Sequence, residues 1–234
     1  MTAETVDGVL VRLAGSLQQL KKTERGLEGW ELIALEKTGE QRLADGGDGN
    51  SLVLLTSRHA IRERSFTVLL FARHGEPPLM GAASFTLDPL EDETAQLRRC
   101  LSAARASGNP AWELPRPGKA PTHSPKECDP GLAADPLGAT DALFAQAEAC
   151  CRALDGVRVN AAELYADVAE RTFLLSTGIR TFRRTSELYF ECAMENAAGL
   201  GANTQEVHNV ARGVHRDSLD LESFLAECAE ETRA

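Results

Sequence analysis

The chain has 234 residues, 43% of them hydrophobic, and a formal net charge of −10 at pH 7. This length allows one large domain or two small ones with a sizeable core, and the acidic balance argues against a large nucleic-acid footprint. No apolar run approaches the roughly 18 residues that a membrane span needs, and the start, Met1-Thr2-Ala3-Glu4, lacks the basic and apolar regions of a signal peptide. The six cysteines lack the spacing of a disulfide framework, so we expect reduced thiols and a cytoplasmic location.

Hydrophobic periodicity predicts a helix and then a sheet at the start of the chain. Apolar residues recur at helical spacing over residues 4–22, which indicates an amphipathic helix facing the core. Residues 30–36 alternate between two faces, as a strand does. The loop 45–50 has neither the ligand spacing of an EF-hand nor the Gly-Lys-Ser/Thr of a P-loop. We therefore expect a surface hairpin loop that leads into a strand at 51–56.

Residues 66–106 are the most strongly patterned stretch. The first strand, within 61–73, is apolar on both faces, which suits a strand covered on both sides. A Gly/Pro turn at 75–78 leads to a second, alternating strand at 82–87. Asp88 then fits the N-cap of a helix, with Pro89 at the first helical position and Glu91 closing a capping box. We expect that helix to run to about Ala106.

A proline-rich segment separates the two halves of the chain. Seven of the ten prolines lie between residues 109 and 136. Because proline removes a backbone donor and fixes φ, we expect an extended connector here. His123 and Cys128 lie within it and could in principle ligate a metal ion, but no further ligand is near them in the sequence, so we assign no metal site.

The second half repeats the order of helix, strand, hairpin, strand and helix. We expect a helix at 137–154, a strand at 160–169, a hairpin over 172–194 with its turn at 176–178, a weaker strand at 206–214 and a last helix from Ser218 or Asp220. The return strand of the hairpin alternates between a buried apolar face (Leu188, Phe190, Cys192, Met194) and a wet one (Glu187, Tyr189, Glu191, Glu195). For the adjacent Cys150 and Cys151 we expect one buried and one half-exposed thiol rather than a strained disulfide.

The common plan of the two halves predicts an α+β fold. We expect two related units of antiparallel sheet with packed helices, joined by the proline-rich connector. The predicted ranges are 1–115 for the first sheet-and-helix unit, 116–136 for the connector and 137–234 for the second unit.

The sequence contains no recognisable catalytic constellation. It has no HExxH, no CxxC and no Gly-x-Ser-x-Gly. Glu206 and His208 fall on one strand face and could ligate a metal ion, but solvation of an edge strand is the expected role. The basic run Arg180, Arg183 and Arg184 could meet an acidic partner, although a solvated face paired with nearby glutamates is the expected reading. We therefore assign no catalytic, cofactor-binding or metal-binding residue.

Three stretches carry a resemblance to a known family. They are Gly-x-Ala-Ser-Phe-Thr-Leu-Asp-Pro-Leu at 81–90 with the Ala-rich helix after it, Asn-Pro-Ala-Trp-Glu-Leu-Pro at 109–115, and residues 160–178, from the Ala-Glu-Leu-Tyr strand to Leu-Leu-Ser-Thr-Gly. With these stretches the chain resembles the N-terminal part of TldD/PmbA-type metallopeptidases, particularly the TldD-related branch.

The resemblance implies a role without catalytic residues in this chain. Family members are about twice as long, and their zinc ligands, on an HExxxH or HExxxD helix plus a later cysteine, belong to the C-terminal half. The chain would then be the non-catalytic N-terminal half of such a zinc peptidase. It would help to form a chamber for unfolded peptides and a subunit interface in a homo- or heterodimer, with zinc in the missing half or a partner.

Two other functions stay open. The chain could be a stand-alone peptide- or protein-binding module without peptidase activity, holding an extended peptide by strand addition. It could also be an enzyme whose site the sequence does not reveal. We expect no nucleic-acid or membrane partner.

Overall fold

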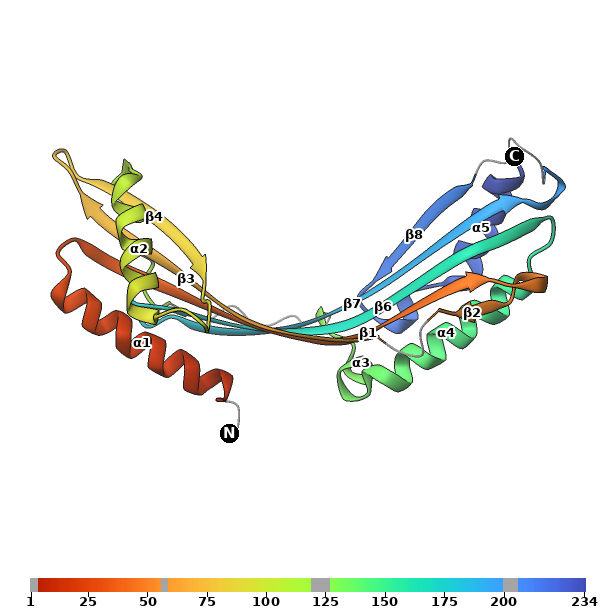
Figure 1. Ribbon diagram of the computed structural model, residues 1–234, viewed down its shortest axis with the longest axis horizontal. Coiled ribbons are helices and arrows are strands. Elements are labelled where there is room, and N and C mark those ends of the chain that lie inside the picture. The colour runs from red at the N-terminus through yellow and green to blue at the C-terminus, as the bar shows by residue number, and fades with distance from the viewer. Residues whose placement is uncertain (1–3, 56–58, 119–126, 200–205) are drawn as a thin grey trace. The chain divides into compact units, whose positions relative to one another are not determined.

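The computed structural model describes residues 4–55, 59–118, 127–199 and 206–234. The fold is α+β, as predicted, with an antiparallel sheet of 8 strands in the order β5-β4-β3-β1-β6-β7-β8 and β2 paired to β1 (Figure 1). The strands are β1 (Leu27–Gly46), β2 (Leu52–Leu54), β3 (His59–His74), β4 (Leu79–Thr86), β5 (Asn109–Pro110), β6 (Val157–Leu175), β7 (Arg180–Asn196) and β8 (Val207–Gly213). The helices are α1 (Val6–Thr23), α2 (Glu93–Ala106), α3 (Pro130–Ala134), α4 (Pro136–Arg152) and α5 (Leu221–Arg233).

Two compact units share this sheet. Unit 1 comprises Met1–Glu36, Arg64–His123 and Glu170–Arg183, and unit 2 comprises Lys37–Glu63, Ser124–Ala169 and Arg184–Ala234. The long strands β1, β3, β6 and β7 contribute residues to both units. The predicted range 1–115 therefore supplies most of unit 1 and residues 37–63 of unit 2, whereas 137–234 supplies most of unit 2 and residues 170–183 of unit 1. As boundaries of separately folding domains, those ranges stay a prediction.

Unit 1 has an apolar core between its helices and one face of its strands. The side chain of Thr5 caps α1 by accepting a hydrogen bond from the Gly8 backbone N–H at 3.2 Å. The buried stripe of α1 packs with α2 and with the strands, and the core residues are Val9, Leu10, Leu13, Leu17, Leu20, Leu27, Trp30, Leu32, Ala34, Val68, Leu70, Ala72, Leu97, Cys100, Leu101 and Ala104. On the opposite face of β3, Phe71 is buried beside Met80 and Leu175. The prediction that this strand is covered on both faces is confirmed.

The start of α2 differs from the prediction. The helix begins at Glu93, and its N-cap is Asp92, whose side chain accepts a hydrogen bond from the Ala95 backbone N–H at 2.7 Å. Asp88 instead closes a tight turn by accepting from the Leu90 backbone N–H at 2.8 Å. Both aspartates can cap a helix, and sequence alone did not distinguish the turn-forming one from the helix-capping one. As a consequence Leu90, which was expected on the helix, is 93% exposed.

The proline-rich segment is extended only in part. Pro110 lies in the short edge strand β5, whereas Pro130 and Pro136 begin α3 and α4. Proline suits the first turn of a helix because its missing N–H would have no helical partner there. Asp129 and Asp135 cap these two helices with their side chains.

Unit 2 buries the predicted faces of its strands against α4 and α5. Its core contains Leu164 and Ala166 of β6 and the predicted buried set of β7, together with Leu143 and Phe144 of α4 and Leu221, Leu225 and Cys228 of α5. Cys151 is buried and Cys150 is half-buried, and both are free thiols, as expected. Burial raises the pKa of the Cys151 thiol to about 12. None of the helices in the described residues is long and apolar enough to cross a membrane.

The predicted hairpin loop at 45–50 is confirmed. It joins β1 to β2, and Asn50 fastens it to the start of β6 by donating to the carbonyls of Leu154 and Val157 and accepting from the Val159 N–H at 3.0 Å. Gly46 is required here, because a Cβ at this position would lie 1.6 Å from the Val159 carbonyl oxygen.

Candidate functional site

The sheet of unit 2 carries polar and aromatic side chains on the face away from α4 and α5. Strand geometry points successive side chains to opposite faces, so the residues between the buried positions of β6 and β7 all lie on this side. We call this surface the polar face. It comprises Lys37 and Gln41 on β1, Glu163, Tyr165 and Asp167 on β6, Glu187, Tyr189 and Glu191 on β7, and His208 and Arg212 on β8.

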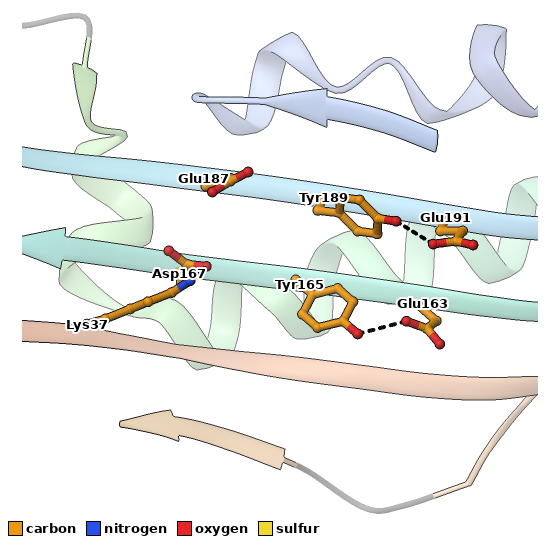
Figure 2. Close-up of a pocket in the computed structure, with 7 residues that line it drawn as sticks. All are labelled: Lys37, Glu163, Tyr165, Asp167, Glu187, Tyr189 and Glu191. Carbon is orange, nitrogen blue, oxygen red and sulfur yellow. Dashed lines mark hydrogen bonds and ion pairs between the residues drawn. The ribbon is translucent and has the colours of Figure 1, made fainter. Parts of the chain in front are cut away.

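The two tyrosines form the centre of the polar face. Their rings meet edge to face, with centroids 5.3 Å apart and an interplanar angle of 85°, a favoured aromatic geometry. Each hydroxyl donates a hydrogen bond to the glutamate two residues away on its own strand: Tyr165 to Glu163 at 2.8 Å, and Tyr189 to Glu191 (Figure 2). The Gln41 amide also donates to the Tyr165 hydroxyl at 2.6 Å. These bonds fix both phenol rings on the surface of the sheet.

The phenols are held in their protonated form. Burial and the hydrogen bond to Glu163 raise the pKa of Tyr165 to about 12. The hydrogen bond to Glu191, followed by burial, raises the pKa of Tyr189. In both cases a neighbouring carboxylate disfavours the tyrosinate. At neutral pH the two hydroxyls therefore act as hydrogen-bond donors and not as bases.

Asp167 and Lys37 form an ion pair beside the tyrosines. The Lys37 Nζ lies 2.9 Å from the Asp167 Oδ2, and the Asp167 side chain is 9% exposed (Figure 2). Burial raises the pKa of Asp167, and the Lys37 ammonium acts against that rise. Glu187 raises it further by charge repulsion. This end of the polar face is consequently richer in negative than in positive charge.

Strand β8 adds Arg212 and His208 at the margin of the polar face. The guanidinium carbon of Arg212 lies 5.3 Å from the centroid of the Tyr189 ring, within the range of a cation–π contact. His208 lies 3.0 Å from Glu206 and 3.6 Å from Glu191. The two candidate metal ligands Glu206 and His208 thus contact each other, and the hydrogen bond from Asn160 is the main cause that lowers the pKa of Glu206.

The other residues considered from the sequence are dispersed. His123 lies outside the described residues, and Cys128 is half-buried next to the N-cap of α3. Arg180, Arg183 and Arg184 are exposed, as expected for a solvated strand face, and Arg180 pairs with Asp7 at 2.8 Å rather than with a glutamate.

The described residues do not offer a zinc site. Residues 4–55, 59–118, 127–199 and 206–234 hold no group of three or more His, Cys, Asp or Glu side chains placed to bind a metal ion. A zinc site in proteins takes three or four such ligands.

The polar face was not predicted as a site. The alternation did place Glu163, Tyr165 and Asp167 on one face of a strand, and Glu187, Tyr189 and Glu191 on the wet face of another. The signal that could have revealed the site is that the chain has only two tyrosines and both stand between acidic residues on neighbouring strands.

Comparison with known proteins places the fold. No protein-family model and no curated protein matches the chain. A proposed modulator of DNA gyrase from Bacteroides thetaiotaomicron has a TM-score of 0.68 at 12% identity, over 98% of this chain and 50% of that one. A second proposed gyrase modulator, from Thermotoga maritima, has a TM-score of 0.64 at 13% identity, over 95% of this chain and 47% of that one. TldE from Thermococcus kodakarensis has a TM-score of 0.53 at 14% identity, over 93% of this chain and 47% of that one.

These likenesses support a TldD/PmbA-related fold, as the sequence resemblance implied. At such low identities they show the fold alone. The chain spans about half the length of these relatives.

Proposed function

We propose that this chain is the non-catalytic N-terminal half of a TldD/PmbA-like zinc metallopeptidase. In this role it helps to form the chamber that receives unfolded peptides and the interface between subunits. The zinc ligands and the cleavage step belong to a peptidase-bearing C-terminal half or partner chain, in a homo- or heterodimer in the cytoplasm.

Two observations support this proposal. The fold of this chain matches about half the length of several solved structures, one of which is TldE. The described residues also bring two tyrosines, four carboxylates and one lysine together on one surface, the polar face.

The polar face is the observation that carries the proposal. Its strands are held from behind by the packed core of unit 2, which keeps the backbone rigid under the site. Its side chains offer hydroxyl donors, carboxylate acceptors and the faces of two aromatic rings. Such a surface can bind the side chains of many different peptides, because each contact is modest and none requires one defined sequence.

A stand-alone peptide-binding module is the second candidate. One observation favours it: every residue of the polar face comes from unit 2 of this chain, so the pocket on this face is lined without a residue from another subunit.

The test combines recovery of a partner with a binding measurement. The full chain, tagged, is used as bait in the native cell extract, and the recovered complex is assayed on an unstructured peptide with chelator and with added zinc. In parallel, fluorescence anisotropy measures binding of the same peptide to the purified chain and to its Tyr165→Ala/Tyr189→Ala variant. Val11→Ala is the control, because Val11 is a 72% exposed residue on α1, outside the polar face.

The outcomes separate the two candidates. The proposal expects a zinc-motif chain in the complex, cleavage that stops with chelator, and peptide binding that weakens in the tyrosine variant only. Peptide binding without a peptidase partner supports the stand-alone module. Absence of both peptide binding and a peptidase partner contradicts both candidates.

A further inference from the structure

The polar face contains a pocket with an excess of negative charge. Its volume is ≈ 350 Å³, at the lower end of the range of roughly 300–1,000 Å³ for small-molecule pockets. Its lining residues are Lys37, Glu163, Tyr165, Asp167, Glu187, Tyr189 and Glu191 (Figure 2). Four of these carry carboxylates and one carries an ammonium group. The walls therefore favour a positively charged occupant.

The single lysine of the lining does not neutralise the rest. Lys37 lies against Asp167, which is the most buried of the four carboxylates. Glu163 and Glu191 each accept a hydrogen bond from a tyrosine hydroxyl, and an ionised carboxylate can accept further hydrogen bonds. Glu187 is exposed and has no hydrogen bond or ion pair with the residues that the structure describes. The carboxylates of Glu163, Glu187 and Glu191 can thus still accept hydrogen bonds from a cationic group.

Two cations of the chain itself already bind on this face. Arg212 lies over the Tyr189 ring, and Lys37 pairs with Asp167. Proteins commonly bind a guanidinium or an ammonium group in these two ways, by a cation–π contact with an aromatic ring and by an ion pair with a carboxylate. The Tyr165 ring, set edge to face against Tyr189, extends the same aromatic surface into the pocket.

We propose that the polar face selects cationic peptides, with a lysine or arginine side chain of an unfolded peptide seated in the pocket between Glu163, Glu187 and Glu191. This inference rests on the proposed peptide-binding function and adds the substrate class. The aliphatic stem of the bound side chain lies against the tyrosine rings, as long cationic side chains commonly do on apolar surface. Its charged end meets the carboxylates.

The test uses peptides that differ only in charge. Three labelled Gly/Ser-rich peptides of equal length carry lysine, glutamine or glutamate at the same positions. Their affinities for the full chain are measured by fluorescence anisotropy. The site variant is Glu163→Gln/Glu187→Gln/Glu191→Gln, and the matched control is Glu222→Gln/Glu227→Gln/Glu230→Gln, which makes the same charge change at exposed positions on α5. Far-ultraviolet circular dichroism verifies that both variants are folded.

The expected result is an affinity for the lysine peptide about tenfold above that for the glutamine peptide, since each exposed ion pair contributes modestly and three carboxylates act together. This preference disappears in the site variant and persists in the control. Because Glu187 is exposed, Glu187→Lys provides a second variant that should fold, and it should reverse the preference toward the glutamate peptide.

Several results would overturn the inference. If the glutamine peptide binds as tightly as the lysine peptide, the charge selection is wrong while the peptide-binding function stands. The charge selection is also wrong, and the peptide-binding function again stands, if the control variant loses the preference for the lysine peptide as fully as the site variant does. If spermidine displaces the lysine peptide at equal concentration of positive charge, the pocket recognises a free polyamine and not a peptide. If none of the three peptides binds, both the charge selection and peptide binding on the polar face are wrong, and the recovery of a peptidase partner then decides the proposed role as a peptidase half.

Discussion

Tyr165 and Tyr189 are the two tyrosines of the chain, and each donates to a carboxylate on the polar face. Because the carboxylate disfavours a neighbouring tyrosinate, the folded protein should ionise its tyrosines at higher pH than the unfolded chain, where the phenol pKa is about 10. Tyr165 should titrate at about 12. A raised pKa means that the folded state retains the proton, so stability should fall as pH rises from about 10 toward the folded value.

Ultraviolet absorbance of tyrosinate, recorded in native buffer and in urea, measures this difference. Glu163→Gln should move the Tyr165 transition toward lower pH, since it removes the negative charge next to the hydroxyl. Near-ultraviolet circular dichroism at each pH monitors whether the fold is intact. Native tyrosines that both ionise near pH 10 while the fold persists would contradict the hydrogen-bonded geometry of the site.

At the scale of elements, Asp129 connects three parts of unit 2. Its carboxylate accepts from the Gly131 and Leu132 backbone N–H groups at 2.7 and 3.0 Å, which caps α3, and from the Arg216 backbone N–H and Nε at 2.9 and 3.1 Å. Its own N–H donates to Ser186 on β7 at 2.7 Å. Burial alone would raise the pKa of Asp129, but these donors together outweigh it and lower the pKa well below its usual value.

Asp129→Asn should therefore destabilise the protein by about 2 kcal/mol at pH 7, because an amide cannot accept all four hydrogen bonds and loses their charge assistance. A carboxyl with a lowered folded pKa contributes stability above its unfolded pKa of about 3.9, and that contribution is lost as pH falls below it. The difference in the free energy of unfolding between wild type and variant, measured with urea, should become smaller from pH 6 to pH 3. Exposed Asp45→Asn is the control. An unchanged unfolding midpoint for Asp129→Asn would refute this role.

Secondary structure was predictable where periodicity and turn chemistry agree. The alternation of β7, the Ser176-Thr177-Gly178 turn and the Asp220 cap of α5 are local signals, and the structure follows them. The start of α2 was not predictable, because Asp88 and Asp92 offer the same capping chemistry. The density of prolines predicts an extended connector, but Pro130 and Pro136 begin helices, since proline is compatible with a first helical turn.

In the whole molecule, the contacts that the sequence did not reveal join residues that lie far apart in the chain. Gln41 and Tyr165 are 124 residues apart in the chain, yet they are hydrogen-bonded. The pocket on the polar face depends on β1, β6 and β7 lying side by side, which no local pattern encodes. Strand β1 spans 20 residues rather than the seven expected at 30–36, and it lies between β3 of its own half of the chain and β6 of the other half.

The proposed function and the further inference both require that an unfolded peptide binds on the polar face of unit 2. Because the chain has only two tyrosines and both lie there, replacing tyrosine with 3-fluorotyrosine places both fluorine-19 labels at the site. The two resonances can be assigned with Tyr165→Phe and Tyr189→Phe, and the lysine peptide is then titrated in. We expect both resonances to shift and to saturate at the peptide concentration where anisotropy shows binding. Peptide binding that leaves both resonances in place would contradict it.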